Sequence, residues 1–169
     1  MDEIRTPWRM RYIASTSRKA ACIFCPPYAE PPRVQEAGRE HFILRHGATA
    51  FIILNLYPYT TGHLMVVPYR HLQRFGDLTG EERAELGRLL RESERILRAA
   101  TGAHRFHAGI NLGRAAGAGV EGHLHAHLVP RDTCGGWADA TGAESPALPV
   151  AEAFRRLAPH FAVGPDAAP

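Results

Sequence analysis

Residues 123–129 read His-Leu-His-Ala-His-Leu-Val, in which histidines alternate strictly with apolar residues. Successive side chains of a strand point to opposite faces, so a strand here would place three imidazoles on one face and three apolar side chains on the other. With a rise of roughly 3.3 Å per residue, neighbouring imidazoles would lie about 6.6 Å apart along the backbone. The pattern therefore indicates either a metal site that uses a neighbouring pair or a nucleophile with two supporting imidazoles.

The segments around this stretch predict further strands joined by turns. Residues 50–56 have the β-branched and aromatic content of a buried strand, and the turn at residues 57–62 leads into the next strand, which Pro68 ends. Pro130 likewise ends the histidine strand. The expected strands are residues 41–45, 50–56, 63–67, 106–112 and 123–129.

One long helix and one shorter helix are predicted between and after these strands. Thr79-Gly-Glu-Glu82 has the form of a capping box, and apolar or small residues then recur at helical spacing, which predicts a helix over residues 80–100. We interpret its charged face, which holds Glu85, Arg88, Glu92 and Arg95, as solvated. A shorter helix is expected at residues 149–157. The order of elements favours an antiparallel α+β fold in one domain, residues 1–160, followed by a flexible tail at residues 161–169.

The composition is that of an ordinary soluble globular protein. The chain has 169 residues, of which 45% are hydrophobic and 22% charged, which excludes a wholly disordered chain and a disulfide-stapled miniprotein. The net charge is +3, but basic and acidic residues are interspersed, so we expect no nucleic-acid partner. Residues 1–20 lack an apolar run of signal-peptide length, which favours the cytoplasm, and polar and proline interruptions in the uncharged residues 48–69 argue against a membrane span.

Cys22 and Cys25 form a Cys-x-x-Cys pair in the opening segment, residues 20–40. Such a pair alone is compatible with zinc binding, with redox activity or with no role. A thioredoxin-type motif requires a helix at the second cysteine, whereas two prolines follow Cys25. The context therefore favours a metal site over a redox pair.

The histidine stretch matches the pattern of the histidine triad family, and the chain resembles that family over roughly residues 6–137. Residues 55–68, which read NLYPYTTGHLMVVP, resemble its upstream Gly-His strand pair, and Asn111-Leu-Gly resembles the strand and turn that face its active site. Together with Thr6-Pro-Trp-Arg-Met10, these blocks are most similar to the bacterial diadenosine tetraphosphate phosphorylase and hydrolase branch. The resemblance implies the histidine-triad fold and, as in many small members, a homodimer.

The same resemblance implies roles for five residues in phosphate chemistry. The middle histidine, His125, is expected to attack an α-phosphorus and form a nucleotidyl-histidine intermediate, as a neutral imidazole is able to do near pH 7. His127 and the upstream His63 are expected to donate hydrogen bonds to phosphate oxygens. Asn111 takes the family's amide position near the phosphates, and Asn55 takes the position of a polar residue that contacts the nucleoside ribose.

Metal ligands are also implied by the resemblance. In zinc-bearing members the two cysteines are joined by a histidine after the Gly-His strand and by the first triad histidine, and these correspond here to His71 and His123. Together with Cys22 and Cys25 they predict one closed, structural zinc site per chain. No organic cofactor is expected, and magnesium is expected only if it arrives with the substrate, because no pair of carboxylates is placed to hold it.

Gly119 departs from the family's pattern. Many members place glutamine or serine four residues before the first triad histidine, where the side chain reaches the phosphate or the leaving group. Glycine removes that side chain. Gly119 occupies a position that contacts the substrate in those members. We therefore expect the turnover rate or the substrate profile of this protein to differ from theirs.

The expected function is cleavage of an α-phosphate bond of a dinucleoside polyphosphate, by hydrolysis or phosphorolysis. A hydrolase of nucleoside phosphoramidates or adenylylated amines needs the same histidines and is the alternative, as is a specialised biosynthetic nucleotide-processing enzyme. Two readings from other classes also stay open. These are a nucleotide-binding module without turnover and a metalloenzyme with a catalytic, histidine-bound metal.

Overall fold

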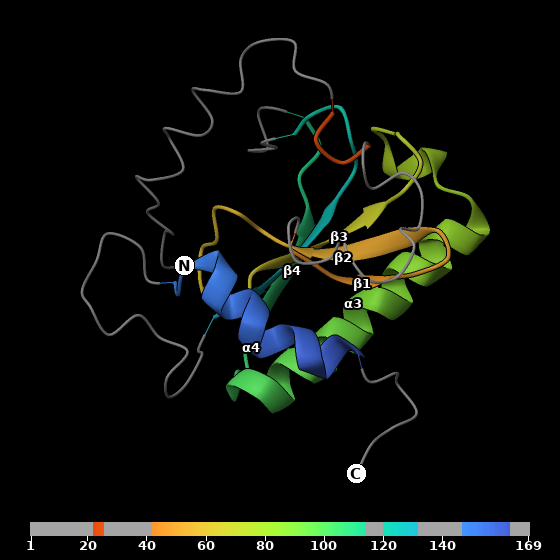
Figure 1. Cartoon of the computed structure of the whole chain (residues 1–169). Helices are drawn as coiled ribbons and strands as arrows, with labels where there is room; N and C mark the ends of the chain where they lie inside the picture. The colour runs from red at the N-terminus through yellow and green to blue at the C-terminus, as the bar shows by residue number, and fades with distance from the viewer. Residues whose placement is uncertain (1–21, 26–41, 114–119, 132–146, 163–169) are drawn as a thin grey trace.

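Five antiparallel strands form one sheet in the computed structural model, which describes residues 22–25, 42–113, 120–131 and 147–162. The strand order across the sheet is β1-β2-β3-β5-β4 (Figure 1). The predicted antiparallel α+β class is confirmed. The strands are β1 (Ile43–His46), β2 (Ala50–Leu54), β3 (Leu64–Pro68), β4 (Phe106–Ile110) and β5 (Ala126–Pro130).

The histidine strand begins later than the alternation predicts. β5 starts at Ala126, and the residues before it leave the ladder with β3, since the backbone N–H of Leu124 donates to the carbonyl of Leu72 at 2.6 Å. The alternation of faces nevertheless continues through this segment, because Leu124 joins the same core cluster as Ala126 and Leu128. The sequence pattern therefore predicts the faces correctly and the strand boundary incorrectly.

Both predicted helices are present, and both lie on the same side of the sheet (Figure 1). A 3₁₀ turn, η1 (Phe75–Asp77), precedes α3 (Gly80–Thr101), which begins at the predicted capping box and ends at Gly102 in the left-handed conformation, φ 70°. The second helix, α4 (Val150–Ala162), continues beyond the predicted Leu157. Residues 161 and 162, which the sequence assigns to the tail, belong to this helix, and buried Phe161 explains why.

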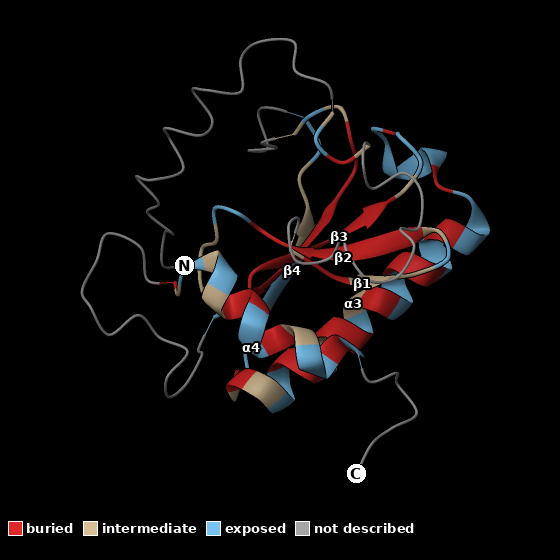
Figure 2. Cartoon of the chain, viewed as in Figure 1, coloured by how far each residue is buried: buried red, intermediate tan, exposed pale blue. Residues whose placement is uncertain are grey.

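The strands β2 and β3 are buried along their whole length, so the sheet is covered on both faces at these strands (Figure 2). Even-numbered side chains such as Ile52 and Leu64 pack with the two helices in the larger cluster. Odd-numbered side chains such as Phe51 and Met65 pack with Phe24 in a smaller cluster on the other face. His127 of β5 shares this second face, because it lies directly across from Met65.

The charged face of α3 is not solvated as the sequence suggests. Glu85 and Glu92 are each only 7% exposed. The Glu85 carboxylate accepts hydrogen bonds from Thr49 and from the Ala48 N–H at 2.9 Å, and Glu92 pairs with Arg45. Helical periodicity does not reveal this burial, because the partners come from β1 and the turn after it.

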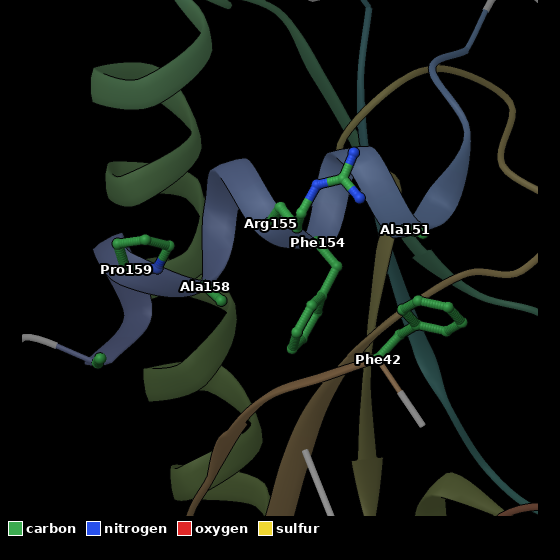
Figure 3. A pocket seen from close by; sticks show the side chains of 7 residues that line it. Phe42, Ala151, Phe154, Arg155, Ala158 and Pro159 are labelled. Carbon is green, nitrogen blue, oxygen red and sulfur yellow. The ribbon is translucent and has the colours of Figure 1, made fainter. Parts of the chain in front are cut away.

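A pocket beside α4 has no part in the histidine cluster. Phe42 and Phe154 meet edge to face across it, with ring centroids 5.8 Å apart (Figure 3). Its lining consists of Phe42, Ala151, Phe154, Arg155, Ala158, Pro159 and Ala162. Within the described parts of the chain, no helix is long and apolar enough to cross a membrane.

Replacing Glu82 with glutamine should make the protein less stable at neutral pH but not near pH 2. Hydrogen bonds from Arg70 are the main cause that lowers the pKa of Glu82 from 4.5 to about 2. The stabilisation is therefore present above pH 4.5 and is lost as the pH falls toward 2. Urea denaturation should show a loss of about 1–3 kcal/mol at pH 7.

The matched control is Glu94→Gln, which removes an exposed pair with Arg98 on the same helix. This change should cost less than about 0.5 kcal/mol. A loss in Glu82→Gln that stays constant from pH 7 to pH 2 would contradict the assigned role of the charge.

Candidate active site and metal centre

Four buried histidines lie beside the antiparallel pair of β3 and β5. His63 directly precedes β3, and His123, His125 and His127 lie along the approach to β5 and its first residues. Their exposed fractions are between 1% and 6%. The structure thus brings together all three triad histidines and the upstream histidine that the sequence singles out.

His63 and His127 form a hydrogen-bonded pair whose proton positions follow from their partners. The Tyr59 backbone N–H donates to Nδ1 of His63 at 3.2 Å, so the neutral His63 ring carries its proton on Nε2. That nitrogen lies 3.0 Å from Nδ1 of His127 and donates to it. His127 consequently carries its own proton on Nε2, on the side of the ring away from His63.

His125 has the opposite tautomer. Its Nδ1 lies 2.8 Å from the backbone carbonyl of His123, which is an acceptor, so Nδ1 carries the proton and Nε2 carries the lone pair. The rings of His125 and His127 meet edge to face, with centroids 4.8 Å apart. A nucleophilic nitrogen and a donor N–H are therefore presented by adjacent imidazoles.

Asn55 is part of this network rather than of an open surface. Its Oδ1 accepts from the Tyr57 N–H at 2.9 Å, which fixes the orientation of the amide. Its Nδ2 donates to Sδ of Met65 at 3.8 Å. It also lies 3.3 Å from Nε2 of His63, but both nitrogens carry hydrogen, so this is a packing contact and not a hydrogen bond. The residue is 7% exposed.

Asn111 and Gly119 are placed less completely. Asn111 follows the last residue of β4, and Ile110 pairs with Ala126, so continuing that register places Asn111 opposite His125 on the same face of the sheet. Asn111 is half-buried. Gly119 lies outside the described residues.

Tyr59 is a site residue that the sequence analysis does not identify. Its ring stacks on His63 with an interplanar angle of 8° and centroids 5.1 Å apart, and its N–H fixes the His63 tautomer. The available signal is its position four residues before His63 in the tight turn ahead of β3. A motif of histidines does not reveal a contribution made by a backbone N–H.

Cys22, Cys25, His71 and His123 form a second cluster beside the first. Their four ligand atoms all lie within 4.8 Å of one another. Sγ of Cys25 lies 3.0 Å from Nδ1 of His71, and Sγ of Cys22 lies 3.3 Å from Nδ1 of His123. Ligands on a tetrahedral zinc ion lie roughly 3.3–3.8 Å apart, given bonds of about 2.0–2.3 Å, so the donor set and its spacing fit zinc.

The protonation of this cluster also suits a metal. Burial is the main cause that lowers the pKa of His123, which keeps its imidazole neutral. The other ring nitrogen of His123 lies 2.8 Å from the carbonyl of Pro68, and donation to it leaves Nδ1 to act as a ligand. Burial and the neighbouring Cys22 raise the pKa of Cys25 to about 11, so ligation requires a cation that displaces the thiol proton.

Comparison with known proteins places these clusters in a family context. A model of the HIT domain family matches residues 38–134. AP-4-A phosphorylase of Mycobacterium tuberculosis is 37% identical over 135 residues, which are 78% of this chain and 68% of that protein.

Two further proteins extend the comparison. The asymmetrical bis(5'-nucleosyl)-tetraphosphatase of Schizosaccharomyces pombe is 33% identical over 94 residues, covering 56% of this chain and 50% of that protein. A zinc-bound histidine triad family protein from Mycobacterium smegmatis has a solved structure that aligns with a TM-score of 0.58 and 27% identity. That alignment covers 72% of this chain and 84% of the other.

Proposed function

The chain belongs to the HIT domain family, and we propose that it cleaves dinucleoside polyphosphates at an α-phosphorus through a covalent adduct on His125. The observation that carries this proposal is the hydrogen bond from Nδ1 of His125 to the His123 carbonyl, which leaves the lone pair on Nε2. The names of the relatives, a phosphorylase and a tetraphosphatase of such substrates, support the substrate class.

The reaction proceeds in two balanced steps. In the first, Nε2 of His125 forms a bond to the α-phosphorus while the bond from that phosphorus to the bridging oxygen breaks. The leaving polyphosphate, which is ATP when the substrate is diadenosine tetraphosphate, takes the electron pair. In the second, an oxygen of water or of inorganic phosphate attacks the same phosphorus and breaks the P–N bond, releasing AMP or ADP respectively.

His127 supplies the donor that this transfer requires. The ring of His127 lies next to that of His125, and its Nε2–H would bond a non-bridging phosphate oxygen as negative charge accumulates there. His63 acts on His127, because its own Nε2 proton is directed to Nδ1 of that ring. We therefore propose that His63 orients His127 instead of donating directly to phosphate, as the sequence analysis expects, and that Asn111 contacts the phosphates.

Zinc is the metal we assign to the second cluster, one ion per chain. Two thiolates and two imidazoles fill a tetrahedral zinc shell, which leaves no position for a reacting water. The ion would supply structural cross-linking of three distant segments, and the chemistry stays with the imidazoles. The cytoplasmic location and the homodimer stay predictions.

Mixing enzyme with radiolabelled diadenosine tetraphosphate and quenching within one turnover should trap a nucleotide on His125. His125→Asn keeps a polar side chain of similar size without the nucleophile, so it should bind nucleotide and form no adduct. Mass spectrometry of the digested protein locates the label. A wild-type protein that binds nucleotide without ever forming an adduct or turning over would favour the binding-module reading.

Product identity with and without inorganic phosphate decides the acceptor. ADP formed only when phosphate is present indicates phosphorolysis, whereas AMP formed in either case indicates hydrolysis. The same assay with an adenosine phosphoramidate tests the alternative substrate class, which a higher kcat/KM on that substrate would support.

Elemental analysis of protein purified without chelator should find one zinc ion per chain. Cys22→Ser should lower both the zinc content and the melting temperature. The reason is that the ion would join the Cys22–Cys25 turn to His71 and His123, which are far from it in the sequence. The matched control is Cys134→Ser, which changes the third cysteine of the chain and should leave the zinc content at one. Protein without zinc, or with zinc unaffected by Cys22→Ser, would refute the assignment.

Asn55→Ala should lower kcat by about tenfold and change KM little. The reason is that Oδ1 of Asn55 accepts from the Tyr57 N–H and so holds the turn that carries Tyr59. The Tyr59 N–H fixes the tautomer of His63, which orients the donor His127, so loss of the amide acts on the chemical step. Steady-state kinetics separates the two parameters. A raised KM with an unchanged kcat would instead support the ribose contact that the sequence suggests.

A further inference from the structure

Phe24 connects the cysteine pair to the catalytic histidines. The N–H of Cys25 donates to the carbonyl of Cys22 at 3.2 Å, which closes a tight turn around the two residues between them. This turn directs Ile23 outward, with 48% of its surface exposed, and Phe24 inward, with 2% exposed. The two neighbours thus have opposite environments within one four-residue loop.

The ring of Phe24 contacts a residue of each cluster. It meets the imidazole of His123 edge to face, with centroids 5.5 Å apart, and the imidazole of His125 at 5.3 Å and 52°. Both separations lie in the range in which aromatic rings attract each other. Phe24 also belongs to the apolar cluster that contains Met65, so the sheet supports its far side.

We propose that Phe24 is a positioning residue that couples the Cys/His cluster to the nucleophilic imidazole of His125. The hydrogen bond to the His123 carbonyl fixes one nitrogen of His125, but a ring held at one atom still tilts. The rings of Phe24 and His127 pack against the His125 ring, with centroid separations of 5.3 and 4.8 Å, and restrict that tilt. Because cysteines flank Phe24 on both sides, a metal bound to them holds the aromatic ring in place.

This inference rests on the proposed function, and it assigns Phe24 no contact with substrate. The expected consequence is specific to the chemical step, because a nucleophile displaced by a fraction of an ångström loses reactivity without a loss of nucleotide affinity. A residue that only fills the core would instead change the melting temperature alone.

The test compares Phe24→Leu and Phe24→Ala with Ile23→Ala, which alters the exposed neighbour in the same turn. Three quantities are measured at a temperature well below unfolding. These are the zinc content, the Kd for diadenosine tetraphosphate and the single-turnover rate of adduct formation. We expect the rate to fall about tenfold in Phe24→Leu and about 100-fold in Phe24→Ala. Zinc content and Kd should stay within twofold of wild type, and Ile23→Ala should match wild type in all three.

Other outcomes overturn the proposal in distinguishable ways. An unchanged rate in Phe24→Leu assigns the ring to packing alone, a raised Kd with an unchanged rate assigns it to nucleotide contact, and loss of zinc assigns it to the metal cluster. Exchange of the His125 Nδ1–H proton with solvent can be measured without turnover. It therefore tests the positioning role even if the protein does not cleave the substrate or Phe24→Ala does not fold. The His125 Nδ1–H proton should exchange with solvent faster in Phe24→Leu than in Ile23→Ala, and equal exchange rates would refute the positioning role.

Discussion

The hydrogen bond from Nδ1 of His125 to the backbone carbonyl of His123 is the interaction on which the site depends. It selects the tautomer of the ring that we propose as the nucleophile, and the acceptor comes from the same short segment. The side chain of His123 meanwhile belongs to the Cys/His cluster, and its other ring nitrogen lies within hydrogen-bond distance of the Pro68 carbonyl. His123 therefore contributes its side chain to the Cys/His cluster and its backbone carbonyl to the hydrogen bond that orients His125, the proposed nucleophile.

The surrounding fold explains how this residue is held. His123 is 1% exposed and lies between the last residue of β3 and the Cys22–Cys25 turn. The alternation that follows places Leu124 and Ala126 in the helix-covered core and the two later histidines on the opposite face. Both clusters therefore lie on the face opposite to the helices, and the burial of β2 and β3 shows that the sheet is covered on both faces at these strands.

Much of this arrangement could be predicted from the sequence, since period-two alternation and a capping box report directly on local geometry. The triad face and the start of α3 follow from such patterns. The buried Glu85, the Tyr59 N–H and the His63 proton direction do not, because each depends on a partner from a different element or on the backbone. The family resemblance supplied the pairing of Cys22 and Cys25 with His71 and His123, which spacing alone left open.

The proposed attack by His125 is tested by identifying which nitrogen is bonded to phosphorus in the trapped adduct. Protein labelled with ¹⁵N in its histidines would be trapped as the adduct and denatured, and ³¹P–¹⁵N coupling would identify the bonded atom. The tautomer set by the His123 carbonyl predicts phosphorus on Nε2 of His125. Phosphorus on Nδ1 of that ring, or on either nitrogen of another histidine, would contradict it.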